Sequence, residues 1–332
     1  MITAFVASIW YDHHKWLIMK KYILLFLFFI FNIITRAQVT YPYPVNYFPL
    51  NIESKDLRMA YMDVPAPSPN GNTVMLFHGK NFNGYYWKDL IAVLSQKGYR
   101  VIVPDQVGWG RSDKPDIHYS FHGLAANSRA LLDSLNIKKV VVIGHSMGGM
   151  LAVRFALLYP GMVEKLVLEN PIGLEDYKTF VPYQSLEKIF NSERKATYES
   201  YKKYQESYYP VWKPEYEQYV KAQAESLLQP DFEKTAWANA LTYQMIYEQP
   251  VVYEFKNILV PTLLIIGQED RTVVGKNLLP EEEQKKYGQY PQLGRKINAA
   301  IVNSKLVELR GVGHIPHIQS PAVFNNALFN FL

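Results

Sequence analysis

Short apolar runs alternate with helical stretches along most of the chain. Each apolar run ends in a turn signal, as expected of strands buried in a parallel sheet. The clearest runs cover residues 73–77, 100–103, 140–143, 165–168, 262–266 and 305–309. The helical stretches cover residues 87–96, 121–135 and 147–159, with a last one from about residue 322. This alternation predicts an α/β fold, with a mainly parallel sheet and helices on both faces.

The alternation stops between residues 171 and 252. This segment is rich in Tyr, Glu, Lys and Gln and has helical spacing without a convincing strand. We expect it to form a helical cap inserted into the α/β core, which then comprises residues 38–170 and 253–332. A second, smaller insertion at residues 276–295 precedes the last predicted strand.

Residues 1–37 are expected to be a targeting signal rather than part of the fold. A basic start at 19–21 precedes the apolar run 23–34 and the small-residue ending Thr35-Arg36-Ala37, which is the order of a secretory signal peptide. Cleavage after Ala37 would export the protein to the periplasm or the medium, with no stable membrane anchor. Because a complete signal starts at Met19, the residues before it are interpreted as an upstream extension.

A transmembrane anchor is the alternative interpretation of the same segment. A helix that crosses the hydrocarbon core needs about 20 predominantly apolar residues. The run 23–34 is shorter and contains Asn32. We therefore favour the signal peptide.

Composition narrows the possible partners. The net charge is +5, but +3 of it lies in the first 37 residues and no Lys/Arg-rich block follows, which argues against nucleic acid. The chain has no cysteine, which excludes thiol nucleophiles, cysteine-ligated metals and disulfides. Its eight histidines show no metal-ligand spacing, and no dinucleotide fingerprint follows a predicted strand. Neither a metal nor a cofactor is expected.

The strongest chemical signal is the stretch VVVIGHSMGG at residues 140–149. A β-run leads into G-x-S-x-G and then into an apolar helix. Small residues flank such a serine because the turn is tight, holds the backbone in a strained conformation and exposes the hydroxyl. This context favours Ser146 as a nucleophile over a merely structural turn.

A serine hydroxyl needs a positioned base to take its proton. Asp270 follows the predicted strand 262–266, and His314 follows the strand 305–309. Both therefore lie past the C-terminal ends of strands, the edge where ligands bind in open α/β sheets. We predict that His314 is the general base and that Asp270 orients it. Glu169, at the end of the strand after the nucleophile's helix, is the rival acid.

In these motifs the chain resembles the α/β-hydrolase superfamily, in the cap-bearing branch of many esterases, C–C bond hydrolases, epoxide hydrolases and haloalkane dehalogenases. The resemblance runs from about Arg58 to the end. It rests on motifs found in family order: His78-Gly79, DQVGWGRS at 105–112, residues 144–149, Asp270 and Gly313-His314. Epoxide hydrolases and dehalogenases use an aspartate nucleophile where this chain has a serine, so their chemistry is not expected.

The resemblance implies a cofactor-free hydrolase that cleaves a small-molecule ester or related acyl compound through an acyl-enzyme. C–C bond hydrolysis, perhydrolysis and non-enzymatic ligand binding on the same fold remain open. The resemblance also implies an oxyanion hole made by the backbone N–H groups of Met147 and Lys80. We expect the Lys80 ammonium to point to solvent, although it could meet an anionic substrate.

Other polar residues near these motifs are expected to have structural roles. Asp105 belongs in the family to a turn with two glycines, and His78 and His145 are expected to be hydrogen-bonded supports. His317 lies either behind the site or at the surface. The cap carries many aromatic residues, which either form a ceiling over the substrate or, for most of them, pack helix seams. These are Tyr177, Tyr183, Tyr198, Tyr201, Tyr204, Tyr208, Tyr209, Trp212, Tyr216 and Tyr219.

Overall fold

The computed structural model describes Lys20 and residues 39–332. Apart from Lys20, the predicted signal peptide, with its cleavage site after Ala37, lies outside the described residues. Residues Tyr41–Leu332 form one compact unit. Among the residues described, no helix has both the length and the apolarity needed to cross a bilayer.

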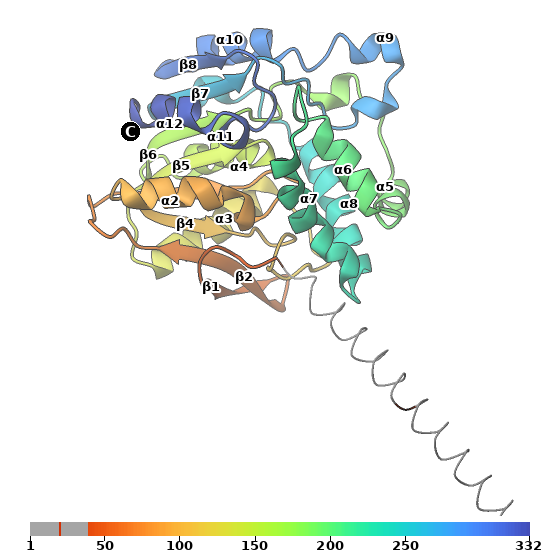
Figure 1. The fold of residues 1–332 in the computed structure, drawn as a ribbon, viewed down its shortest axis with the longest axis horizontal. Helices are drawn as coiled ribbons and strands as arrows, with labels where there is room; N and C mark the ends of the chain where they lie inside the picture. The colour runs from red at the N-terminus through yellow and green to blue at the C-terminus, as the bar shows by residue number, and fades with distance from the viewer. Residues whose placement is uncertain (1–19, 21–38) are drawn as a thin grey trace, which may run out of the picture. The chain divides into compact units, whose positions relative to one another are not determined.

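Eight strands form one sheet in the order β1-β2-β4-β3-β5-β6-β7-β8 (Figure 1). The pairs β1–β2 and β2–β4 are antiparallel, and all other neighbouring pairs are parallel. The strands cover Val45–Ile52 (β1), Lys55–Val64 (β2), Thr73–Phe77 (β3), Arg100–Pro104 (β4), Val140–His145 (β5), Val163–Glu169 (β6), Thr262–Gly267 (β7) and Ser304–Leu309 (β8).

Every predicted apolar run is a strand, but the sequence analysis missed the hairpin of β1 and β2. Central strands such as β3 and β5 are buried along their whole length, which is why they read as continuous apolar runs. β1 is an edge strand whose residues are exposed or half-buried, and it contains Pro49, which is tolerated at a sheet edge. The exposed positions of β1 hold asparagine, tyrosine and proline, so this strand shows no continuous apolar run in the sequence.

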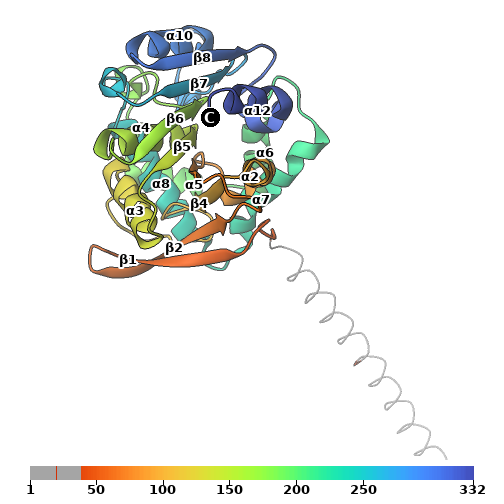
Figure 2. The same cartoon turned by 90° about the vertical axis from the view of Figure 1, so that its left-hand side faces the viewer.

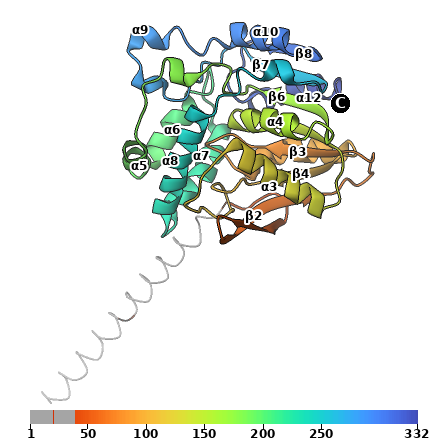
Figure 3. The ribbon, with the colours of Figure 1, turned by 180° about the vertical axis from the view of Figure 1, so that it is seen from behind.

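Helices cover both faces of the sheet, as Figures 2 and 3 show. One face carries α2 (Lys88–Gln96), α11 (Pro316–Gln319) and α12 (Pro321–Phe329), and the other carries α3 (Phe121–Ser134), α4 (Met147–Leu158) and α10 (Tyr290–Ala300). Side chains of β5 alternate between the two cores: Val140 and Val142 pack with α3, α4 and α10, whereas Val141 and Ile143 pack with α2 and α12. The predicted α/β fold class is confirmed.

The chain between β6 and β7 is helical, in the segment expected to form a cap. Its helices gather at one end of the sheet, beside the loops that follow the parallel strands (Figure 1). They are η2 (Tyr177–Thr179), α5 (Leu186–Glu193), α6 (Tyr198–Glu206), η3 (Pro214–Tyr216), α7 (Glu217–Ala224), η4 (Glu225–Leu228) and α8 (Phe232–Glu248), and η5 (Phe255–Asn257) follows this segment just before β7. Shorter elements elsewhere are η1 (Gly84–Trp87), η6 (Lys276–Leu278) and α9 (Glu281–Gln284). We refer to residues 171–252 as the cap.

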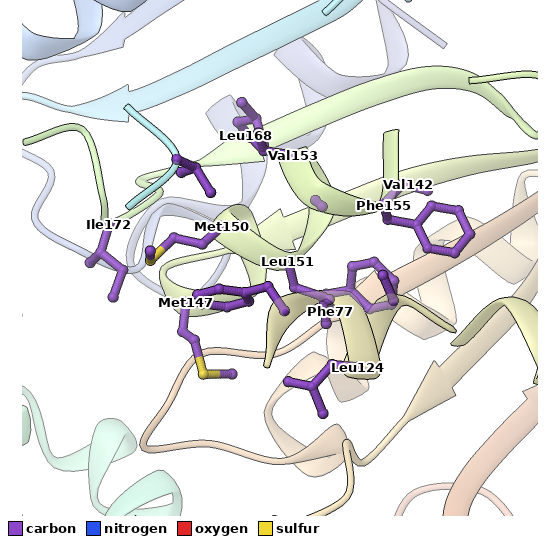
Figure 4. Packing of buried hydrophobic residues seen from close by; sticks show 14 of the residues in the cluster. Phe77, Leu124, Val142, Met147, Met150, Leu151, Val153, Phe155, Leu168 and Ile172 are labelled. Atoms are coloured by element: carbon purple, nitrogen blue, oxygen red, sulfur yellow. The ribbon is translucent and has the colours of Figure 1, made fainter. Parts of the chain in front are cut away.

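Helix α4 lies directly against the sheet (Figure 4). Phe155 of α4 packs edge-on against Phe77 of β3, with ring centroids 5.8 Å apart. One turn of the helix comes closer still, because a Cβ built on Gly148 would lie 2.0 Å from the Phe77 carbonyl oxygen. Only glycine allows the helix to begin this close to the strand.

We therefore expect Gly148→Ala to destabilise the fold by about 2 kcal/mol, because the added methyl group would push the start of α4 away from the backbone of β3 in a packed core. The direction of this change in stability is informative, because helix propensity alone would make alanine more stabilising than glycine inside a helix. Gly161→Ala is the matched control, since a Cβ there meets nothing within 4 Å. Urea unfolding of both variants checks this, and equal stability of the two would contradict it.

Candidate active site

Ser146 occupies the turn between β5 and α4, where the sequence predicted it. Its backbone has φ 55° and ψ −121°, a strained conformation for a residue other than glycine. The residue is nearly buried, at 6% exposure. Its N–H donates to the Glu169 carbonyl oxygen over 3.2 Å, and its own carbonyl oxygen accepts from the Gly149 N–H. The turn is therefore held from both sides.

His314 and Asp270 form a buried pair. Nδ1 of His314 lies 2.7 Å from Oδ2 of Asp270, with the two side chains 0% and 1% exposed. Nε2 of His314 is buried and has no hydrogen-bond partner among the described residues. The carboxylate accepts from Nδ1, so in the neutral imidazole Nε2 is the nitrogen that can accept a proton.

Further hydrogen bonds fix the carboxylate of Asp270. Oδ2 also accepts from Nδ2 of Asn170 over 2.7 Å, and Oδ1 accepts from the Thr272 N–H over 2.8 Å. Burial by itself would raise the pKa of Asp270, but attraction to His314 and hydrogen bonds from His314 and Thr272 outweigh burial and hold the pKa below its usual value. Asp270 is therefore ionised and can orient the imidazole of His314.

Glu169, the rival acid, has a different partner. Its carboxylate accepts from the His317 N–H over 2.8 Å and lies 2.9 and 3.0 Å from Nδ1 of His317. Glu169 is fully buried and His317 is 6% exposed, so the surface position considered for His317 is wrong. The structure thus contains two acid–imidazole pairs side by side, of which Asp270–His314 includes the predicted base.

The loop after β3 lies against Ser146. A Cβ on Gly79 would be 3.1 Å from Cβ of Ser146, so the following residue, Lys80, starts beside the nucleophile. The Lys80 carbonyl oxygen accepts from Nε1 of Trp109 over 2.7 Å, which fixes this peptide. Met147 is the first residue of α4, where helix N–H groups have no partner within the helix. Both predicted oxyanion donors therefore lie next to Ser146 in the chain or in space.

The sequence suggested that the Lys80 side chain points to solvent, but in the structure it does not. Its Nζ lies 3.6 Å from Oε1 of Glu193 in the cap, and the two side chains are 15% and 21% exposed. Glu193 also accepts a hydrogen bond from Nδ2 of Asn239 in α8. The prediction failed because the cap supplies a carboxylate from far along the chain.

His145 joins the loops around the nucleophile. Its Nε2 lies 2.9 Å from the His314 carbonyl oxygen, and its Nδ1 lies 3.1 Å from Oη of Tyr86, which accepts the Gly79 N–H. A carbonyl oxygen can only accept, so Nε2 carries the proton and Nδ1 accepts from the tyrosine. Burial, followed by the nearby His314 and His317, lowers the pKa of His145 well below its usual value. The imidazole of His145 is therefore neutral.

Asp105 and His78 are structural, as predicted. The Asp105 carboxylate accepts from the N–H groups of Gly84 and Arg111 and from Oη of Tyr41. Nε2 of His78 accepts the Gln106 N–H over 3.0 Å, and burial lowers the pKa of His78. Both residues hold loops in place beneath the site.

The cap aromatics divide between the two roles considered for them. Tyr208 stacks on the imidazole of His314, with ring centroids 4.7 Å apart and planes at 28°. The next residue, Tyr209, instead stacks on Tyr216 inside the cap at 4.0 Å, and Trp212 packs edge-on to both. Packing inside the cap explains these three, whereas Tyr208 lies over His314.

Sequence reasoning missed Asn170 and Tyr86. Asn170 directly follows β6 and has a left-handed φ of 35°; its side chain contacts Asp270 and also accepts the Gly267 N–H. A polar residue at the C-terminal end of a central strand was a signal for it. Tyr86 lies in η1 with no motif around it. In the described part of the chain, no group of His, Asp and Glu side chains could hold a metal ion.

Comparisons with known proteins agree with the fold. The family model of the alpha/beta hydrolase fold matches residues 72–321. A solved structure of a probable hydrolytic enzyme from Pseudomonas aeruginosa is similar over 88% of this chain and 95% of that one, with 46% identity and a TM-score of 0.87. A 2-hydroxy-6-oxononadienedioate/2-hydroxy-6-oxononatrienedioate hydrolase of Paraburkholderia phymatum is 29% identical over 77% of this chain and 92% of its own length.

An uncharacterized protein of Mycobacterium tuberculosis is also similar, with 39% identity over 105 residues. This match covers 32% of the present chain and 30% of the mycobacterial protein. The chain thus spans under a third of that relative.

The neutral His145 predicts a pH dependence of stability. Because its pKa is depressed in the folded state, the unfolded state binds more protons below the ordinary histidine pKa of about 6.5, and stability falls as pH drops through that value. His145→Gln can still donate to the His314 carbonyl oxygen but cannot titrate. We expect the wild type to lose about 2 kcal/mol more than this variant between pH 7.5 and pH 5.0. Urea unfolding at both pH values measures the difference, and parallel losses would contradict it.

Proposed function

The chain belongs to the α/β-hydrolase family, and on that premise we propose that it cleaves a carboxylic ester or a related acyl compound through an acyl-enzyme. The observation that carries the proposal is the buried pair of His314 and Asp270, whose free imidazole nitrogen has no partner among the described residues. A position of this pair near Ser146 is supported by His145, the residue before Ser146, whose side chain contacts the His314 carbonyl oxygen. Fold alone does not fix function, so the proposal rests on this site.

In the first half of the reaction, Oγ of Ser146 attacks the substrate carbonyl carbon while Nε2 of His314 takes the hydroxyl proton. Asp270 stays ionised and stabilises the imidazolium through Nδ1. The carbonyl oxygen becomes an oxyanion, and the N–H groups of Met147 and Lys80 stabilise it, each worth about 3 kcal/mol in such a hole. The imidazolium then gives its proton to the leaving alcohol as the C–O bond breaks.

In the second half, water attacks the acyl-enzyme. His314 takes a proton from the water, a second oxyanion forms at the same two N–H groups, and the C–O bond to Ser146 breaks. The proton returns to Oγ of Ser146, and the carboxylic acid leaves. His145 remains neutral throughout because its pKa is well below the usual value, so it does not compete for the proton.

Hydrolysis of a C–C bond is the second candidate. It is favoured by the similarity to the Paraburkholderia phymatum hydrolase, which extends over 92% of that protein. The same serine, histidine and acid would serve a diketone substrate. A spectrophotometric assay separates the two candidates: steady loss of a ring-opened dienol diketone without turnover of p-nitrophenyl esters would favour C–C hydrolysis.

We also propose, from the sequence of residues 1–37 alone, that the protein is exported to the periplasm or the medium and acts there on a small-molecule substrate. Apart from Lys20, this segment lies outside the described residues.

Ser146→Ala should abolish covalent labelling by a fluorophosphonate and lower turnover about 10⁶-fold, because no other hydroxyl replaces the nucleophile. Ser134→Ala is the matched control; its hydroxyl donates to the Leu131 carbonyl oxygen at the end of α3, away from the site. Mass spectrometry of the labelled protein and ester turnover measure both. Residual activity above about a thousandth of the wild type would remove Ser146 from the mechanism.

The two buried acids should differ in their effect on turnover. Asp270→Asn keeps the shape but favours the wrong imidazole tautomer, so we expect kcat to fall about 10⁴-fold. Glu169→Gln changes the partner of His317 rather than of His314, and we expect a loss of about tenfold. The ratio of kcat values on one chromogenic ester is the measurement, with circular dichroism to confirm folding. A larger loss at position 169 than at 270 would assign the role to Glu169.

A further inference from the structure

One cap residue is built into the loop of the proposed base. The His314 N–H donates to the Tyr208 carbonyl oxygen over 2.8 Å, and the Tyr208 ring stacks on the His314 imidazole at 4.7 Å. Tyr208 follows α6 in the cap, whereas His314 follows β8 in the core. The backbone and the side chain of the same cap residue therefore contact the backbone and the side chain of His314.

The neighbouring Gly313 shows how closely the cap approaches. A Cβ on Gly313 would lie 2.1 Å from the Tyr208 carbonyl oxygen and 3.0 Å from Cδ of Pro210. Gly313 does not have a left-handed backbone, because its φ lies outside the positive range. Glycine is needed here because of the cap and not because of the local conformation.

The other end of Tyr208 contacts the loop that carries the proposed oxyanion donor. Its Oη accepts from Nδ2 of Asn81 over 2.9 Å, and Asn81 directly follows Lys80. The Tyr208 ring also lies 6.0 Å from the ring of Phe82 in the same loop. A single side chain thus spans the distance between the base and the oxyanion loop.

The hydrogen bond from Nδ1 of His314 to Asp270 does not by itself prevent the imidazole from tilting, and Tyr208 restricts this motion. A single contact at Nδ1 fixes one edge of the imidazole but allows the ring to tilt about that bond. A face-to-face neighbour blocks this tilt, and the main-chain bond to the His314 N–H fixes the backbone from which the ring projects. Reacting groups displaced by about 1 Å can lose about 100-fold in rate, so control of tilt has a kinetic consequence.

We propose that Tyr208 is a positioning residue that holds the imidazole of His314 and the Lys80 loop in register, so that this corner of the cap is a fixed part of the reaction centre and not a lid that swings away. The proposal rests on the proposed hydrolase function for its kinetic consequence. Its geometric part, the fixed imidazole, does not depend on that function.

The test compares Tyr208→Leu with Tyr209→Leu in the full mature chain. Leucine at 208 keeps the main-chain bond but removes the stacked ring, and we expect kcat on a p-nitrophenyl ester to fall about 10- to 100-fold with KM changed less than about threefold. Tyr209 is equally buried, at 6% exposure like Tyr208, yet it stacks within the cap. Its variant should lower Tm while leaving kcat within about twofold.

Two further variants separate the contacts. Tyr208→Phe keeps the ring and loses the contacts of the hydroxyl with Asn81 and Tyr204, so it should cost less than the leucine variant, about two- to fivefold. Gly313→Ala leaves Tyr208 unchanged but pushes its carbonyl oxygen away, and we expect a loss of at least about tenfold. Gly161→Ala, where a Cβ meets nothing, should have no effect. If Tyr208→Leu does not fold, Tyr208→Phe and Gly313→Ala provide the test.

A readout independent of turnover is the downfield proton NMR resonance of Nδ1–H of His314. It should broaden or shift in Tyr208→Leu and Gly313→Ala and stay unchanged in Tyr209→Leu. Unchanged kcat and resonance in folded Tyr208→Leu or Gly313→Ala would overturn the positioning role. Wild-type protein that neither turns over esters nor reacts with a fluorophosphonate would instead count against the proposed function, and the resonance would still decide the role of Tyr208.

Discussion

The close approach of helix α4 to the sheet is the constraint on which the site depends. Ser146 has a backbone conformation that costs about 1–3 kcal/mol and persists only where its surroundings enforce it. Here the enforcement is steric: a Cβ on Gly144 would lie 2.2 Å from the Gly148 carbonyl oxygen, and a Cβ on Gly148 would lie 2.0 Å from that of Phe77. Hydrogen bonds from the Ser146 N–H and to its carbonyl oxygen complete the support. With the turn fixed, α4 begins at Met147, directly after Ser146.

Electrostatics imposes the second constraint, because three imidazoles lie close together in the interior. The ring of His145 is 4.8 Å from that of His314 and 5.9 Å from that of His317. Buried charges need a partner, and each of the outer two histidines has its own carboxylate. His145 has none and stays neutral, held between a carbonyl oxygen and a tyrosine hydroxyl. In the proposed reaction, positive charge that develops on His314 would thus be stabilised by Asp270 and not shared with His145.

Sequence patterns predicted what depends on local order and missed what depends on contacts between distant segments. Buried strands read as apolar runs, and the loops after β5, β7 and β8 meet because parallel strands end at one edge, so Ser146, Asp270 and His314 could be placed in advance. The sequence favoured Asp270 over Glu169 but did not exclude Glu169, because the two acids lie at the ends of neighbouring strands. The path of the turn 314–317 decides which histidine each acid contacts. The partner of Lys80 was out of reach for the same reason: Glu193 is one of many charged residues of the cap.

The glycine before His314 shows how the cap and the core are matched. The atoms nearest to a Cβ on Gly144 or on Gly148 belong to the core itself. All three atoms nearest to a Cβ on Gly313 belong instead to Tyr208 and Pro210 of the cap. The loop of Gly313 and His314 is therefore complementary to this particular cap. The His314 N–H donates to the Tyr208 carbonyl oxygen, so the cap must have a peptide carbonyl at that position. A different cap grafted onto this core would have to present a carbonyl oxygen and a flat ring at the same place, because without them the N–H of His314 would be buried without a partner and its imidazole would be free to tilt.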